Sequence, residues 1–574
     1  MRIIFFNLFI FSCLSSSLTG QTGNEFSGTG AGNGVSTGDY NTAFGYQALY
    51  YDNASYASTF GAFGGYASQN NVTTLGYKAG YFYSYVSIHL GVSAGYGYNY
   101  SYGDSYCSLI GHNIGVGSKS IHGSIMIGEN IGNHTTSGDY SVFVGHNAAY
   151  SYDVEDEAVI IGHNAGYYSQ QGGNIAIGNY ATGYGNGAAG YLHSTGSWNV
   201  SLGASAGSSI ATGNYSTFIG TGAGAYAKGK NDNTFVGGLA GYNTATENTA
   251  GSAYRNTLIG YKAGYSNIGG ANNTVVGYNA DFADTSFNQV MMVGANTLAS
   301  ADYLTLAGYG ATGTAEGGVG IGNEITMGGE RAVGVGYQTN IGESGDYSIS
   351  LGYQSSMSGD SSIGIGYLTD VQGSAAVAIG KEAAVAGDHS TALGSTHVIS
   401  SSNAMALGYN MSISTDNQIN IGNDDVMSIS GITNWVTTSD SRLKTNIQAD
   451  IPGLDFILKL RPVTYQLAVD SGRQTMPPSA NNRIRYTGFI AQEVAQTAQS
   501  LSYDFSGIDK PQHENDRYGL RYSQFTVPLV KAVQEISDQQ QQTQQMIENS
   551  SEKIHSMDAL LENLEKRMAQ VSSN

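Results

Sequence analysis

The sequence predicts a mainly β protein: a parallel β-solenoid, followed by a C-terminal α+β domain that ends in a long helix. Three observations predict this fold class. Glycine makes up 81 of the 574 residues and recurs behind apolar residues at regular steps. All six prolines lie after residue 437, which leaves the whole glycine-rich part without one. An unbroken heptad pattern occupies the last part of the chain.

Composition excludes several classes of protein. Charged residues are only 11% of the chain and the net charge is −20, which argues against a general nucleic-acid-binding protein. Glycine without a strict triplet period, together with few prolines, excludes collagen. Two cysteines, Cys13 and Cys107, cannot form a disulfide framework or a zinc site. We therefore expect no metal and no cofactor.

Residues 1–20 are typical of a signal peptide. Arg2 precedes an apolar run over residues 3–11, and small residues follow up to Gly20, so we expect cleavage before Gln21. A lipoprotein site at Cys13 is the weaker alternative. The apolar run is too short for a membrane span, and no later stretch is apolar enough. We expect a secreted or cell-surface protein.

Residues 21–293 and 294–436 are predicted to form the solenoid, because both carry a glycine repeat. The first range has irregular coils of 15–25 residues and the second has regular coils of 14 residues. The regular step is seen in Gly352, Gly366, Gly380, Gly394, Gly408 and Gly422. Before each glycine the apolar residues alternate, as Val377 and Ile379 do, which indicates strands. One such coil encloses almost no core, so stacking and sharing of an apolar face between chains are expected.

Several motifs in this region imitate functional sites. Gly91–Gly95 and Gly203–Gly207 match the G-x-S-x-G nucleophile pattern, but each begins on a repeat glycine and lacks a following helix signal. Gly-His-Asn recurs at residues 111, 145 and 162, which could stack histidines for a metal or could reflect a tolerant slot after glycine. Tyrosine-rich stretches such as residues 98–102 are either an adhesive, glycan-stacking surface or half-buried stacking residues.

The regular repeats resemble a known family. Residues 374–380, Ser-Ala-Ala-Val-Ala-Ile-Gly, and residues 403–408, Asn-Ala-Met-Ala-Leu-Gly, are similar to head repeats of trimeric autotransporter adhesins. The resemblance implies a left-handed parallel β-roll, a homotrimeric fibre and adhesion to a cell-surface or glycan receptor. It does not bring the membrane anchor of that family.

Residues 437–528 carry four motifs in a fixed order. They are Ser-Asp-Ser-Arg-Leu-Lys from residue 439, Leu-Arg-Pro-Val-Thr-Tyr from 460, Gly-Phe-Ile-Ala-Gln-Glu-Val from 488 and Tyr-Gly-Leu-Arg-Tyr from 518. This set resembles the S74 peptidase family, the intramolecular chaperones at the ends of phage tailspikes and tail fibres. The resemblance implies that the domain trimerises the chain, guides the upstream fibre and then cuts itself off. The family's nucleophile and base map onto Ser439 and Lys444, with scission between Thr438 and Ser439.

The chemistry of this motif requires those residue types. A serine hydroxyl is a weak nucleophile and needs a base nearby. A lysine serves only when neutral, so burial or a neighbouring cation must lower the pKa of such a base. Arg442 is a candidate neighbour and Asp440 would act the other way, while Ser441 is the rival nucleophile.

Residues 529–574 are predicted to form a coiled coil, because apolar residues recur at alternating steps of four and three. The seam runs through Leu529, Val533, Ile536, Gln540, Thr543, Ile547, Ser550, Ile554, Met557, Leu561, Leu564, Met568 and Val571. A helix of this length exceeds the size of a small domain, which favours partner helices over packing on its own domain.

The sequence therefore predicts an exported homotrimeric β-fibre, a surface adhesin or receptor-binding fibre, whose C-terminal chaperone cuts itself off. The alternative is a virus-type tail-fibre component, or a structural fibre whose chaperone stays attached. No external substrate is expected. An enzyme acting on an external polymer would need a pair of acidic residues that does not stand out here.

Overall fold

The computed structural model describes most of the chain between residues 23 and 572. Within that range it leaves out residues 34, 36, 52–53, 68–69, 82–85, 97–105, 117–120, 134–137, 151–155, 168–171, 182–195, 210–211, 228–230, 245–252, 285, 424, 427, 434, 467–484 and 512–516. The predicted signal peptide and the tyrosine-rich stretch at residues 98–102 lie outside the described residues. The chain forms two compact units, Met1–Ser428 and Ile429–Asn574.

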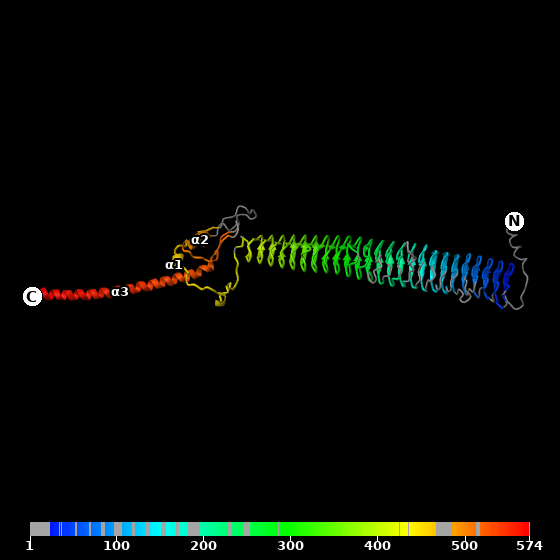
Figure 1. Cartoon of the computed structure of the whole chain (residues 1–574), viewed down its shortest axis with the longest axis horizontal. Helices are drawn as coiled ribbons and strands as arrows, with labels where there is room; N and C mark the ends of the chain where they lie inside the picture. Colours follow the sequence, from blue (N-terminus) through cyan, green and yellow to red (C-terminus); the bar gives the residue numbers. More distant parts are fainter. Residues whose placement is uncertain are drawn as a thin grey trace. The chain divides into compact units, whose positions relative to one another are not determined.

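The first unit is a stack of coils, and each coil gives one short strand to a long parallel sheet (Figure 1). The strands are β1 Glu25–Ser27, β2 Thr42–Phe44, β3 Ser58–Phe60, β4 Thr73–Leu75, β5 Ile88–Leu90, β6 Ser108–His112, β7 Ile125–Glu129, β8 Val142–His146, β9 Val159–Ile161, β10 Ile175–Ile177, β11 Val200–Leu202, β12 Thr217–Ile219, β13 Thr234–Val236, β14 Thr257–Ile259, β15 Thr274–Val276, β17 Met291–Val293, β19 Thr305–Ala307, β21 Val319–Ile321, β23 Val333–Tyr337, β25 Ile349–Tyr353, β27 Ile363–Tyr367, β29 Val377–Ile379, β31 Thr391–Ser395, β33 Met405–Tyr409 and β35 Ile419–Ile421. Each strand pairs in parallel with that of the next coil, as Ile349 with Ile363 shows.

A second parallel sheet accompanies the first from β16 onward. Its strands are β16 Asp281–Phe282, β18 Leu298–Ala299, β20 Thr312–Gly313, β22 Thr326–Met327, β24 Asn340–Ile341, β26 Ser356–Met357, β28 Asp370–Val371, β30 Ala384–Val385, β32 Val398–Ile399 and β34 Ser412–Ile413. These coils hold two short strands each, as a 14-residue period predicts. The predicted mainly β class and parallel β-solenoid are confirmed.

The repeat glycine is required by the contact between coils. Gly352 has a φ of +147°, and a Cβ built on it would lie 1.7 Å from the carbonyl oxygen of Gly366, the same glycine one coil later. Any side chain would therefore force the coils apart, besides straining the backbone. This close approach explains why the glycine recurs without exception over the regular coils.

The core of the solenoid is a column of buried side chains that, among the described residues, forms three clusters in succession. From β2 to β33 the second residue of each strand points inward, and Phe143, Phe218 and Phe235 fill the earlier coils. From β21 to β33 the same position holds only glycine, serine or alanine: a Cβ on Gly364 would lie 2.5 Å from the sulfur of Met357, which the second sheet contributes. A small residue on one sheet thus compensates for a large one on the other, as dense packing requires.

The second unit is a small α+β domain that continues into a long helix. Its elements are η1 Ser441–Leu443, α1 Leu454–Ile457, β36 Val463–Tyr465, β37 Tyr486–Gly488, α2 Ala491–Ser500, β38 Ile508–Asp509, β39 Gly519–Leu520, η3 Tyr522–Phe525 and α3 Thr526–Ser572. The core consists of Phe456, Val494, Ala498, Phe505 and Phe525. α3 has 47 residues, or about 70 Å at 1.5 Å per residue, which confirms the predicted long C-terminal helix.

Candidate active site

The segment that begins at Ser439 forms one tight turn. Asp440 is the N-cap of η1, and its Oδ1 accepts a hydrogen bond from the backbone N–H of Arg442 at 2.8 Å. At the other end of the turn the backbone N–H of Lys444 donates to the carbonyl of Ser441 at 3.1 Å. A side-chain cap at one end and a backbone bond at the other thus hold the turn.

Ser439 and Lys444 meet across this turn. The Nζ of Lys444 donates to the Oγ of Ser439 at 2.7 Å, a hydrogen bond of good length between the two residues that the sequence predicts as base and nucleophile. Ser441, the rival serine, lies inside η1, and among the described residues the side chain of Lys444 hydrogen-bonds to Ser439 and not to Ser441. Of the two serines, Ser439 is therefore the one in contact with Lys444.

Asp440 and Arg442 form an ion pair beside this contact. The Nε of Arg442 lies 3.1 Å from both carboxylate oxygens of Asp440, and its terminal NH2 group lies 2.7 Å from Oδ2. Hydrogen bonds from the Arg442 side chain and backbone lower the pKa of Asp440, while the pairing raises the pKa of Arg442. From the sequence, these two residues were expected to shift the pKa of Lys444 in opposite directions, and their pairing with each other was not predicted. An Asp just before a short turn is a local signal that could have indicated it.

The turn is exposed in the single chain, and so are large apolar side chains around it. The exposed apolar residues of this segment are Ile429, Ile432, Trp435, Val436, Leu443 and Ile447. Ile432 and Val436 are essentially fully exposed, at 107% and 93%. A serine–lysine pair works as nucleophile and base only when water is kept from the amine. Any chemistry of this kind would need a cover over this segment.

The three later motifs converge on one small module. β36 pairs antiparallel with β37, with Val463 opposite Gly488. The hydroxyl of Tyr522 accepts a hydrogen bond from the backbone N–H of Phe489 at 3.0 Å. A Cβ on Gly488 would lie 2.2 Å from that hydroxyl, so only glycine admits Tyr522 here. Motifs that are separated in the chain thus form one structural unit.

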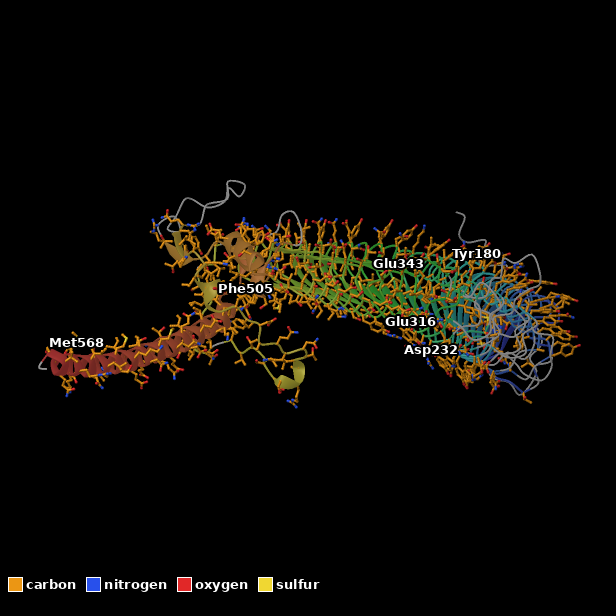
Figure 2. All side chains as sticks on the ribbon, turned by 60° about the vertical axis from the view of Figure 1, so that its left-hand side comes forward. Tyr180, Asp232, Glu316, Glu343, Phe505 and Met568 are labelled. Atoms are coloured by element: carbon orange, nitrogen blue, oxygen red, sulfur yellow. The ribbon has the colours of Figure 1, made fainter. Side chains whose placement is uncertain are left out.

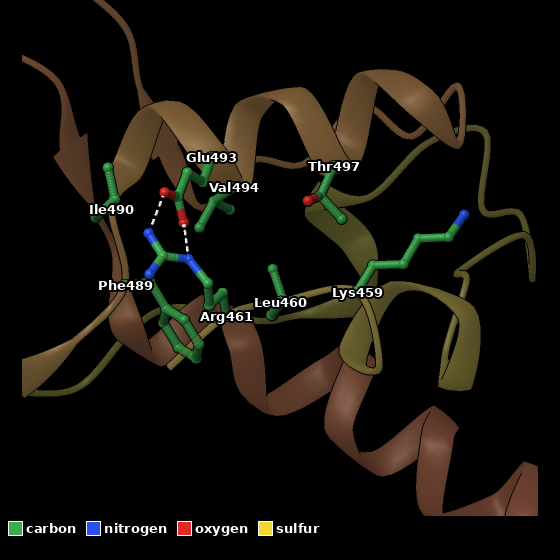
Figure 3. A pocket seen from close by; sticks show the side chains of 8 residues that line it. All are labelled: Lys459, Leu460, Arg461, Phe489, Ile490, Glu493, Val494 and Thr497. Carbon is green, nitrogen blue, oxygen red and sulfur yellow. Dashed lines mark hydrogen bonds and ion pairs between the residues drawn. The ribbon is translucent and has the colours of Figure 1, made fainter. Parts of the chain in front are cut away.

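An ion pair joins two of these motifs. Arg461, just before β36, contacts Glu493 in the first turn of α2, with Nε 3.0 Å from Oε2 and the terminal NH2 group on Oε1 (Figure 3). The pairing lowers the pKa of Glu493 and raises that of Arg461. The cavity beside it is only about 20 Å³, room for about one water molecule. This pair is structural, and a shallow groove along β36 and β37 is too open to enclose a small ligand.

The predicted heptad seam of α3 is uncovered. Side chains project from the helix along its length, and Met568 is 70% exposed (Figure 2). Of the apolar seam residues, those exposed are Leu529, Val533, Ile536, Ile547, Ile554, Met557, Leu561, Leu564, Met568 and Val571. Only Pro528 and Ala532 of this helix are buried. The seam is thus free to contact other helices.

The solenoid also has an uncovered apolar face. In the strands of the first sheet from β2 to β33, the residues before and after each buried second residue are Thr, Ser, Ile, Val, Leu, Phe, Met or Ala, and none is charged. We call these outward-pointing positions the apolar face. Leu75, Ile125 and Val293 on it are 56%, 43% and 43% exposed. At about 4.8 Å per strand the face extends over about 100 Å, far more than a monomer ordinarily exposes.

The imitations of functional motifs have structural explanations. Ser93 and Ser205 of the two G-x-S-x-G matches lie at φ values of +57° and +56° in turns after β5 and β11, with no helix following. The asparagines of Gly-His-Asn lie at φ of +52° to +54°, a conformation that asparagine tolerates, and Asn147 donates to Asn164 at 3.0 Å. Among the described residues, no group of three or more His, Cys, Asp or Glu side chains could hold a metal ion.

Comparison with known proteins identifies the second unit in part. A family model described as Peptidase_S74, chaperone of endosialidase, matches residues 439–502. The match begins at Ser439 and supports the S74 resemblance, while the resemblance of the repeats to autotransporter heads stays a prediction. No curated protein matches the chain. Within the described residues, no helix combines the length and apolarity that a membrane span needs. An S74-type chaperone behind a β-solenoid fits a phage-like fibre.

Proposed function

We propose that the chain is an exported homotrimeric β-fibre, a surface adhesin or receptor-binding fibre, which a C-terminal chaperone assembles before cutting itself off between Thr438 and Ser439. The observation that carries this proposal is the 2.7 Å contact of Lys444 Nζ with Ser439 Oγ, at the first residue of the S74 match. The predicted division into residues 1–20, 21–293, 294–436, 437–528 and 529–574 belongs to the same proposal.

The cleavage chemistry follows from the position of the nucleophile. Ser439 supplies both the attacking Oγ and the nitrogen of the bond that breaks. Lys444, in its neutral form, takes the hydroxyl proton as Oγ adds to the carbonyl carbon of Thr438 and closes a five-membered ring. The C–N bond breaks, the amine of Ser439 receives the proton, and an ester joins Thr438 to Oγ. Water then hydrolyses the ester, which leaves a carboxylate on Thr438 and a free hydroxyl on Ser439.

Assembly of the chains would create the conditions that the cleavage chemistry needs. In the single chain the pair is exposed, whereas a serine–lysine pair acts as nucleophile and base only where water is kept from the amine. The apolar side chains next to it, Trp435 and Val436 among them, call for a cover that a second or third copy of this segment would give. Cutting would then follow assembly and not precede it.

Two uncovered surfaces support self-association. The seam of α3 has the heptad spacing of a coiled coil, and the apolar face of the solenoid carries no charge that a partner would have to match. Both extend along the chain and repeat at a fixed step, so copies of the same chain fit both in register. Three copies is the state that the resemblance implies.

The test is a denaturing gel of the full chain. The wild type is expected to give two fragments, and the smaller one should begin Ser-Asp-Ser-Arg on N-terminal sequencing. Ser439→Ala and Lys444→Ala should each remain one chain, whereas Ser441→Ala, a matched change two residues away, should cleave. Hydroxylamine added during cleavage should leave a hydroxamate on Thr438, because it attacks esters.

Two outcomes would contradict the proposal. Full cleavage of Lys444→Ala would remove lysine from the chemistry. An uncut wild type that is nevertheless trimeric would instead favour the alternative, a structural or tail-type fibre whose chaperone stays attached.

A further inference from the structure

We propose that Asp440 and Arg442 are a positioning pair for the self-cleavage: they hold Lys444 on Ser439 and keep the carboxylate of Asp440 from stabilising the protonated lysine. This inference rests on the proposed self-cleavage and adds two residues to it. Neither Asp440 nor Arg442 takes a proton or touches the bond that breaks. Each acts through Lys444.

The first role is geometric. Ser439 and Lys444 are five residues apart, and only a turn of defined shape brings their side chains to 2.7 Å. Asp440 fixes the start of that turn by capping the backbone N–H of Arg442. The same carboxylate grips the guanidinium through three contacts between 2.7 and 3.1 Å. One carboxylate therefore holds the turn through both a backbone N–H and a side chain. This limits the conformations that separate Lys444 from Ser439.

The second role is electrostatic. The charged groups of this turn are Asp440, Arg442 and Lys444. Among the described residues, Asp440 and Arg442 form an ion pair and Lys444 takes part in none. In the described part of the chain, the Lys444 side chain hydrogen-bonds to Ser439 and to no residue of another element. An unpaired carboxylate in this turn would favour the ammonium form, which cannot accept the hydroxyl proton. The guanidinium of Arg442 neutralises that carboxylate.

The two roles predict different effects for three variants. Arg442→Gln frees the carboxylate, so the pH of half-maximal cleavage should rise by about half to one unit. Asp440→Ala removes the cap, so the cleavage rate should fall about tenfold at every pH. Asp440→Asn keeps a capping oxygen and loses the negative charge. It should recover most of that rate, and its pH of half-maximal cleavage should not rise.

The experiment follows cleavage of the newly made full chain. A short pulse of labelled cell-free synthesis is shifted to buffers between pH 6 and 10, and the fragments are counted on gels over time. Arg567→Gln, the same chemical change in an exposed part of α3 outside the seam, is the matched control and should follow the wild type. Ser439→Ala gives the background without self-cleavage.

The outcomes separate this inference from the function beneath it. If Arg442→Gln and Asp440→Ala superimpose on the wild type in rate and in pH dependence, the positioning pair is wrong and self-cleavage stands. If the wild type cuts no faster than Ser439→Ala, self-cleavage itself is wrong. An equal loss at all pH values in Arg442→Gln and Asp440→Ala, without recovery in Asp440→Asn, would indicate a structural role and overturn the inference.

Discussion

At the scale of single residues, the solenoid is governed by what its narrow interior accepts. The buried second position of the strand holds phenylalanine in β8 and glycine in β27, where Met357 of the second sheet takes up the space. Polar residues at this position are the exceptions. His89 in β5 is fully buried between Thr74 and Leu109 of the neighbouring coils.

His89 makes the stability of the N-terminal coils depend on pH. Burial lowers the pKa of His89 from 6.5 to about 3, so the imidazole is neutral in the folded chain over the range in which the unfolded chain takes up a proton. Protonation therefore favours the unfolded state. The contribution of this group is fully present above pH 6.5 and falls by about 1.4 kcal/mol per pH unit per chain between that value and about pH 3.

The measurement is the apparent melting temperature at pH 7.5 and pH 4.5 at one scan rate. His89→Leu, which puts the residue type of the next coil in this slot, should lose less on acidification than the wild type. His389→Asn, at an exposed histidine with positive φ, should lose as much as the wild type. An equal acid shift in all three proteins would mean that His89 does not control this response.

At the scale of elements, periodic features were open to prediction from sequence and single contacts were not. The strands and the repeat glycines were predictable because one steric requirement recurs in every coil, as between Gly352 and Gly366. The contact of Ser439 and Lys444 was accessible only through the family motif. The pairing of Arg461 with Glu493 was missed, because the two residues are 32 positions apart and each alone reads as a surface charge. Long-range pairing of this kind leaves no local pattern.

A threonine ladder shows the same limit in another form. Thr217, Thr234, Thr257 and Thr274 stand in register at the first positions of β12–β15. Their separations in sequence are unequal because the coils differ in length, so a fixed-period reading does not find them. Register belongs to the sheet and not to the spacing along the chain.

The seam of α3 can be tested as an element. An aspartate at Ile554 would put a charge into the predicted helix–helix contact, so Ile554→Asp should lower the assembly to monomer or aggregate. Ala559→Asp adds the same charge at an exposed position outside the seam and should assemble as the wild type does. Light scattering coupled to size exclusion measures the mass of both. A trimeric Ile554→Asp protein would show that the seam does not hold the chains together.

At the scale of the whole molecule, the two units solve different problems. Strand pairing in the first unit is parallel and joins successive coils, and the apolar face carries no charge that would fix the register between chains. Such a face can slide by one coil at little cost. The second unit has a helix of 47 residues, and helices form and pair quickly from local contacts. Alignment by α3 would therefore precede, and fix, alignment of the coils.

If α3 aligns the chains before the coils pair, a fibre that has lost the second unit by cleavage should no longer refold efficiently. Cleaved wild-type fibre, denatured in guanidinium and diluted, should recover at least about tenfold less native trimer than uncut Ser439→Ala fibre, because its chains no longer share a tether that raises their local concentration and sets their register. Before denaturation the two fibres should melt alike, since the solenoid is the same in both. Recovery is measured by sedimentation and by resistance to protease. Equal recovery would mean that the coils find their register without the C-terminal unit, and the proposed role of this unit in alignment would be wrong.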